Sequence, residues 1–69
     1  MKVNNKEDAR RLIAELLADP AAAQTRNLRL AMENLELDQM YYEQKGNDQG
    51  VQRCEVCLDL LRRRLAELT

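Results

Sequence analysis

The sequence predicts an all-α protein forming one domain over residues 1–69, in which a short N-terminal helix precedes a long antiparallel helical hairpin. Residues that favour helices, chiefly Ala, Leu, Glu, Gln and Arg, make up most of the chain. β-Branched residues are few, and no stretch alternates apolar and polar residues as a half-buried strand does. Pro20 and the glycines Gly46 and Gly50 divide the chain into three helical segments.

The first helix is expected over about residues 6–18. Asn5 can cap its N-terminus, and Glu7 and Asp8 place negative charge in its first turn, where the helix dipole favours it. Apolar residues recur on one face at helical spacing, so this face is expected to be buried. They are Ala9, Leu12, Ile13, Leu16 and Leu17.

The second helix is expected over about residues 20–45. A residue before proline is pushed out of the helical conformation, so Asp19 marks the boundary and is a suitable N-cap. Pro20 then suits the first helical position. The helix should stop at Gly46, because glycine readily adopts the left-handed conformation common at helix ends.

The third helix is expected over about residues 51–67, with Asn47 or Asp48 as its N-cap. The loop between Gly46 and Gly50 is short, which makes the second and third helices an antiparallel hairpin. One stripe of the third helix is expected to face the core. It contains Val51, Cys54, Cys57, Leu58, Leu61, Leu65 and Leu68, and leaves Val56 and Leu60 on other sides.

The residue inventory argues against an enzyme. The chain contains no His and no Ser, so it lacks the base and the hydroxyl nucleophile of most hydrolytic sites. Two thiols without imidazoles do not complete a structural zinc site, and no glycine-rich phosphate-binding motif is present. We therefore expect no catalytic residues, no metal and no cofactor.

Charge and hydropathy point to a soluble cytoplasmic protein. The formal net charge is −1, which argues against a dominant nucleic-acid-binding or membrane-binding surface. No apolar run is long enough to span a bilayer, and the first residues do not read as a secretory leader. Two cysteines three residues apart form no disulfide framework, which favours a reducing compartment.

The second helix carries apolar residues on two nearly opposite sides, so it needs two neighbours to bury both. One side contains Leu28, Ala31, Met32, Leu35 and Tyr42, and the other contains Ala23, Leu30, Leu37 and Tyr41 with Met40 beside it. The third helix can cover one side. The other can be covered by the first helix, by another polypeptide, or by a twist of the hairpin itself.

The first helix is too short to cover the whole second helix, so apolar residues toward Gly46 are expected to stay exposed. We expect the bundle to be completed by oligomerisation, either as a homodimer or in a heteromeric complex. Tyr41 is the strongest single contact residue, because tyrosine suits interfaces. The predicted partner-binding residues are Leu30, Leu37, Met40, Tyr41, Val56 and Leu60.

Two further motifs admit a second interpretation. Cys54 and Cys57 are expected to pack in the core, with a redox or shared-metal pair and an intersubunit contact as the alternatives. The basic residues of the third helix are expected to form a salt-bridged solvated face near Glu33 and Glu36, with contact to nucleic acid as the less favoured alternative. These basic residues are Arg53, Arg62, Arg63 and Arg64.

The layout resembles several small bacterial adaptor families, among them the smaller co-chaperones of the type III secretion needle subunit. A short lead helix, the break at Pro20 and a hairpin over residues 28–68 carry the resemblance. It implies a heteromeric complex that masks an aggregation-prone helix. Small phage-encoded inhibitors have a similar character. The sequence therefore predicts a non-catalytic interaction protein, acting as an adaptor, chaperone or inhibitor.

Overall fold

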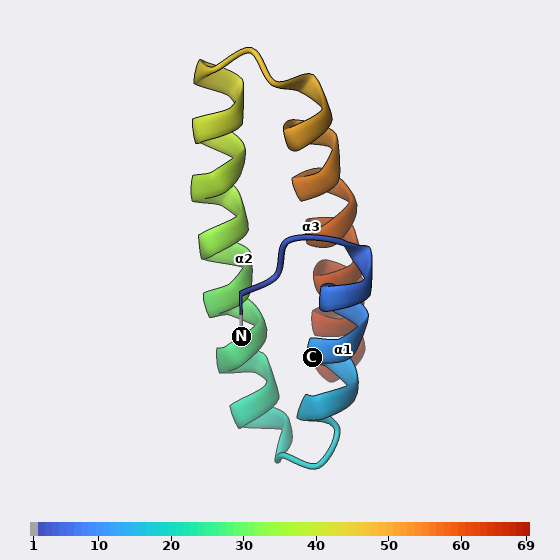
Figure 1. Ribbon diagram of the computed structural model, residues 1–69. Coiled ribbons are helices and arrows are strands. Elements are labelled where there is room, and N and C mark those ends of the chain that lie inside the picture. The colour runs from blue at the N-terminus through green and yellow to red at the C-terminus, as the bar shows by residue number, and fades with distance from the viewer. Residues whose placement is uncertain (1) are drawn as a thin grey trace.

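The computed structural model describes residues 2–69 and contains three helices. They are α1 (Lys6–Leu16), α2 (Ala21–Gln44) and α3 (Asp48–Leu68), and no strand is present in this part of the chain (Figure 1). The predicted all-α class, with a short lead helix and a long hairpin, is confirmed.

The two long helices lie side by side and antiparallel, joined by a short turn, while α1 packs against α3 (Figure 1). α1 lies beside the C-terminal half of α3 and makes only minor contact with α2. The molecule is elongated, with extents of 39 × 18 × 18 Å. The half of the hairpin nearest Gly46 therefore has no third helix beside it.

The core is a narrow column along the line where the three helices meet. α3 supplies more of its buried residues than either other helix, and both cysteines belong to it. Because α1 and α2 both pack on α3, each contributes only one stripe. The buried apolar residues are Val3, Ala9, Leu16, Leu28, Leu35, Cys54, Cys57, Leu58 and Leu61.

The N-terminus of α1 is capped as predicted. The Asn5 side chain accepts a hydrogen bond from the Asp8 amide at 2.9 Å, which satisfies one of the free N–H groups of the first turn. The helix ends at Leu16, two residues before the predicted end. Its last turn closes through a bond of 3.3 Å from the Leu17 amide to the Ala14 carbonyl, and the turn that follows has a bond of 2.9 Å from the Asp19 amide to the Leu16 carbonyl.

The start of α2 differs from the prediction. Pro20 occupies the N-cap position with an extended ψ of 154°, and no side chain caps the helix. The expected cap by Asp19 is therefore wrong. Gln24 ties down this turn instead: its amide nitrogen donates to the Asp19 carbonyl at 2.8 Å, and its backbone N–H donates to the Pro20 carbonyl at 3.0 Å.

The turn between α2 and α3 is tighter than predicted. Gly46 has the expected left-handed backbone, with φ of 69°. α3 begins at Asp48, three residues before the predicted start, because the Asn47 side chain accepts from the Gly50 amide at 3.0 Å. Of the two predicted caps, Asn47 is the one used, and Gly50 lies inside the helix.

Candidate functional site

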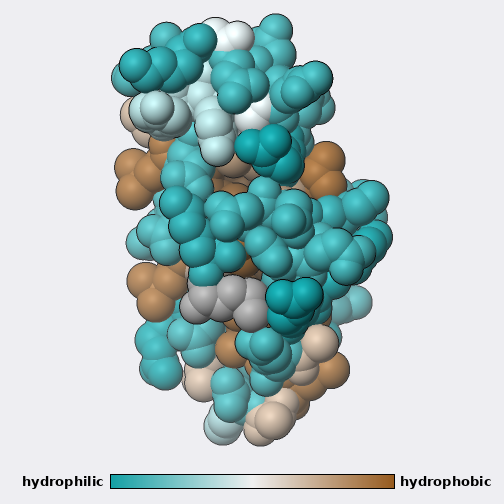
Figure 2. Space-filling view, in the orientation of Figure 1, coloured by the Kyte–Doolittle hydropathy of each residue, from teal (hydrophilic) through white to brown (hydrophobic). Residues whose placement is uncertain are grey.

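One side of α2 exposes a row of apolar side chains, which we call the α2 stripe: Ala23, Leu30, Leu37, Met40 and Tyr41. The four large residues expose between 53% and 63% of their surface. The space-filling view shows apolar side chains along the edge of the molecule formed by α2, on the left (Figure 2). The predicted two-sided character of this helix is thus present in the structure, with one side unpartnered.

The opposite side of α2 is the one that builds the core. Leu28 and Leu35 are buried there, and Tyr42 is half-buried against α3. The ring of Tyr42 covers Gly50 and lies 5.6 Å from the Arg53 guanidinium, while its hydroxyl accepts from Arg53 at 3.4 Å. Core packing therefore fixes which side of α2 faces outward.

The two tyrosines of α2 have different surroundings, as the sequence predicts. Their rings meet edge to face, with centroids 5.7 Å apart. Tyr42 packs inward, whereas Tyr41 is exposed and has the Lys45 ammonium 5.7 Å from its ring centroid. Tyr41 thus lies in the part of the α2 stripe nearest Gly46. Its apolar ring and its polar hydroxyl are both accessible there to a partner.

The structure does not bring the two predicted α3 residues to the α2 stripe. Val56 is 45% exposed, but it lies on the outer side of α3, roughly opposite the buried face that contains Leu58 and Leu61. Leu60 is half-buried and packs against the core. The single surface expected from both helices is therefore restricted to α2.

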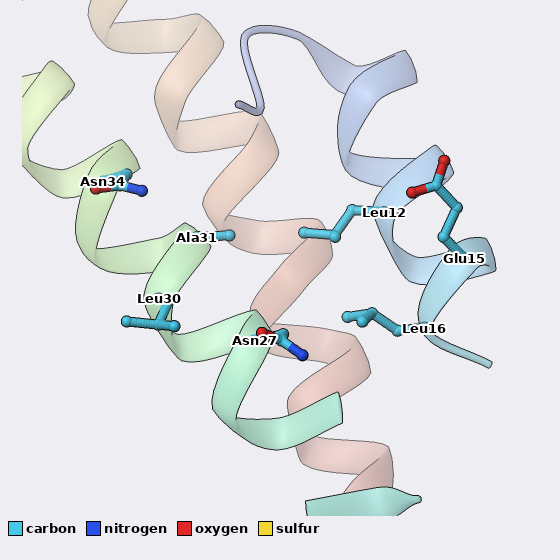
Figure 3. A pocket seen from close by; sticks show the side chains of 7 residues that line it. All are labelled: Leu12, Glu15, Leu16, Asn27, Leu30, Ala31 and Asn34. Atoms are coloured by element: carbon cyan, nitrogen blue, oxygen red, sulfur yellow. The ribbon is translucent and has the colours of Figure 1, made fainter. Parts of the chain in front are cut away.

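A groove between α1 and α2 adjoins the α2 stripe (Figure 3). Its volume is about 350 Å³, and Leu12 and Leu16 point into it from α1 while Ala31 points from α2. The groove exists because α1 packs on α3 and leaves space beside α2. Sequence reasoning missed it, since it assigned the whole apolar face of the first helix to the core. Its lining residues are Leu12, Glu15, Leu16, Asn27, Leu30, Ala31 and Asn34.

One exposed apolar residue was also missed. Leu17, just after the end of α1, is 60% exposed. Its position at helical spacing after Ile13 predicted burial, but the helix has already ended at Leu16. An earlier helix end, which the Asp19-Pro20 pair signals only approximately, would have placed Leu17 in the turn.

Three of the four arginines of α3 are paired with acidic residues of α3 itself. Arg62 lies 3.6 Å from Glu55, Arg63 lies 2.9 Å from Asp59, and Arg64 lies 3.1 Å from Glu67. The expected pairing with Glu33 and Glu36 is wrong for the described residues, because the antiparallel register sets the end of α3 beside the start of α2.

Arg64 differs from its two neighbours in being half-buried. One of its terminal nitrogens donates to the Gln24 side chain at 3.1 Å, and its Nε is buried without a hydrogen-bond partner among the described residues. Arg53 faces Tyr42. The predicted basic residues are therefore held by separate local contacts, and they do not form one open patch.

The two cysteines are buried and free, which confirms their predicted place in the core. Burial raises the pKa of both thiols above the ordinary value of 9.0. The negative charge of Asp38 adds to this rise in the pKa of Cys54, and the Cys54 sulfur and Asp8 add to it for Cys57. A raised pKa disfavours the nucleophilic thiolate, so this pair has the properties of core residues.

Within residues 2–69, no cluster of three or more Cys, Asp or Glu side chains is arranged to hold a metal ion. Over the same residues, no helix combines the length and apolar character needed to cross a bilayer. Comparisons with protein-family models, with curated proteins and with solved structures gave no significant match.

Proposed function

We propose that this protein is a non-catalytic interaction module that docks a helix of another polypeptide on the α2 stripe. One observation carries the proposal. Leu30, Leu37, Met40 and Tyr41 are each more than half exposed on one side of α2, although the opposite side of the same helix builds the core. Several large apolar side chains exposed along one side of a helix mark a binding surface more often than scattered single ones do.

The composition of the α2 stripe suits contact with another helix. Leucines at positions 30 and 37 are two helical turns apart and offer anchors at the spacing that helix-binding surfaces use. Met40 can adapt its shape to a partner, and Tyr41 can bury its ring while its hydroxyl stays in water. The groove beside Leu30 and Ala31 gives a partner helix a second wall.

The biological form of this docking is that of an adaptor, chaperone or inhibitor, each of which works by covering or presenting a helix. We place it in the cytoplasm, because two free buried thiols suit a reducing compartment. The nucleic-acid alternative has less support, since three of the four candidate arginines are paired with carboxylates of their own helix.

Site-specific photo-crosslinking in the producing cell tests this function. A photoreactive residue at Leu37, in the α2 stripe, should give discrete protein adducts, and these can be with another protein or with a second copy. The same residue at Gln52, exposed on α3, is the matched control and should give few or none. Equal labelling at both positions, or none at position 37, would contradict the proposal.

A further inference from the structure

Apart from Met40, the residues of the α2 stripe and two asparagines between them follow alternating spacings of four and three. This is the heptad pattern of a coiled coil, whose core positions are called a and d. Successive d positions hold Ala23, Leu30 and Leu37, and successive a positions hold Asn27, Asn34 and Tyr41. Ala23 and Asn27 are half-buried and the other four positions are exposed, and no helix within residues 2–69 packs closely along this side of α2.

The two asparagines decide what can cover the α2 stripe. Asn34 is exposed, Asn27 is half-buried, and neither side-chain amide makes a hydrogen bond within residues 2–69. A purely apolar helix would bury both amides without partners, which is unfavourable. A helix that covers the α2 stripe must therefore carry polar groups opposite Asn27 and Asn34.

A second copy of α2 meets this requirement in one orientation. In a parallel, in-register pair, each a position faces itself, so Asn27 meets Asn27 and Asn34 meets Asn34, and amide can bond to amide. In an antiparallel pair, a positions face d positions, and the asparagines would meet Leu or Ala. We propose, building on the docking function above, that the α2 stripe binds the α2 stripe of a second copy as a parallel, in-register two-stranded coiled coil.

The size of the α2 stripe fits a small dimer interface. From Ala23 to Tyr41 it runs for about 27 Å of helix. Its four large apolar side chains are more than half exposed. Two copies with their flanking side chains would remove on the order of 1,000 Å² from water, which is near the lower limit for a specific interface. The dimer is therefore expected to form in the micromolar range.

The neighbouring helices leave the approach open. α1 packs on α3, and the groove of about 350 Å³ separates it from α2 (Figure 3). Leu12 and Leu16 line the far wall of this groove, where they can contact the incoming helix. α1 thus leaves the α2 stripe accessible to a second helix.

The charges beside the α2 stripe weaken this dimer, and reversing one of them tests the parallel arrangement. In the parallel arrangement, Glu33 of one copy faces Asp38 of the other on each flank, which is a like-charge pair. Lys2 lies 3.8 Å from Asp38 and weakens this repulsion. The variant Glu33→Lys would convert both repulsive pairs into attractive ones.

Sedimentation equilibrium of Glu33→Lys measures this effect. We expect the dimer dissociation constant to fall by roughly 3- to 10-fold at low salt, with the gain lost at high salt. The antiparallel pairing that aligns all of the a and d positions from Ala23 to Tyr41 sets residue 33 against itself, so the same variant gives no gain there. Unchanged or weaker association of Glu33→Lys would overturn the parallel arrangement.

Disulfide trapping tests the register. The variant Tyr41→Cys should form a disulfide-linked dimer under mild oxidation, because residue 41 faces itself only in the parallel pair. Gln52→Cys on α3 is the control and should stay monomeric, and the native cysteines are buried. A Tyr41→Cys protein that remains monomeric would overturn the proposal.

Different results contradict the docking function and the coiled-coil dimer. If photo-crosslinking at Leu37 captures only a different protein while the purified chain stays monomeric at hundreds of micromolar, the dimer proposal is wrong and the docking function stands. If neither a second copy nor another protein is captured at position 37, both are wrong.

Discussion

The two glycines of this chain have different physical tasks, although they lie four residues apart. Gly46 has a φ of 69°, and a Cβ there would meet nothing within 4 Å. Gly50 is helical, and a Cβ there would lie 2.5 Å from Cγ of Tyr42. Gly46 is thus required by backbone conformation, and Gly50 by the close approach of an aromatic ring.

Substitution of Gly50 by alanine should destabilise the protein. Overpacking against Tyr42 costs about 1–3 kcal/mol, and the better helix propensity of alanine returns about 1 kcal/mol. We expect a net loss of about 1 kcal/mol in the free energy of unfolding, measured by urea denaturation. Gln49→Ala, at an exposed site in the same turn, is the control. A Gly50→Ala protein that is more stable than wild type would show that the ring moves aside freely.

The buried thiols should make the unfolding free energy depend on pH. Burial raises the pKa of Cys54 and Cys57 in the folded state, so their contribution to stability is complete below the unfolded value of about 9.0. It is lost as pH rises through the raised folded-state pKa values. Unfolding free energy should therefore fall above about pH 9, and more steeply than in the Cys54→Ala/Cys57→Ala variant. Parallel pH profiles for the two proteins would contradict this account.

At the scale of elements, a polar contact ties the start of α2 to the end of α3. Gln24 is buried; it donates to the Asp19 carbonyl at 2.8 Å and accepts from Arg64 at 3.1 Å. This contact holds the turn before α2, a helix whose N-terminus has no side-chain cap within residues 2–69. It also fixes the register between the two ends of the hairpin.

Gln24→Ala should therefore cost about 1–2 kcal/mol of unfolding free energy, because it leaves buried polar groups without partners. A double-mutant cycle with Arg64→Met should give a coupling energy of about 0.5–1 kcal/mol. Arg63→Met, at an exposed neighbouring site, should change stability by less than about 0.5 kcal/mol. Additive effects of Gln24→Ala and Arg64→Met would mean that the two side chains do not stabilise each other.

Local signals predicted the elements well, and tertiary contacts account for the differences. Asn5 and Gly46 act where the sequence places them, because capping and left-handed turns depend on a few neighbouring residues. The start of α3 at Asp48 is also local, because the Asn47 side chain caps it. The contact of Gly50 with the Tyr42 ring, eight residues away in sequence, is tertiary, and no local pattern contains it.

The candidate site was predicted in part for the same reason. The periodicity of α2 shows two apolar sides, and the structure leaves Leu37 and Tyr41 exposed on one of them. The apolar face of the first helix can pack on either long helix. The spacing of apolar residues therefore does not predict that it packs on α3, or that a groove results. The sequence predicts one surface that combines Val56 and Leu60 with residues of α2. Sequence does not give the rotation of α3 relative to α2, which places them on different sides of the hairpin.

At the scale of the whole molecule, three helices cannot bury all four apolar faces that the sequence provides. α3 is covered by both neighbours, whereas α2 is covered on one side only. The consequence is a buried side and an exposed apolar side on the same helix. On the proposed docking function, the exposed side should be dispensable for folding of the monomer and necessary for association.

Sedimentation equilibrium of the wild type and of Leu37→Glu/Tyr41→Glu tests this claim most directly, with far-ultraviolet circular dichroism on the same samples. We predict that the wild type passes from its monomer mass of 8.0 kDa to twice that mass as concentration rises through the micromolar range. The double variant should stay at 8.0 kDa with unchanged helicity. Loss of helicity in the variant would instead place Leu37 and Tyr41 in the core of the monomer, and contradict the account.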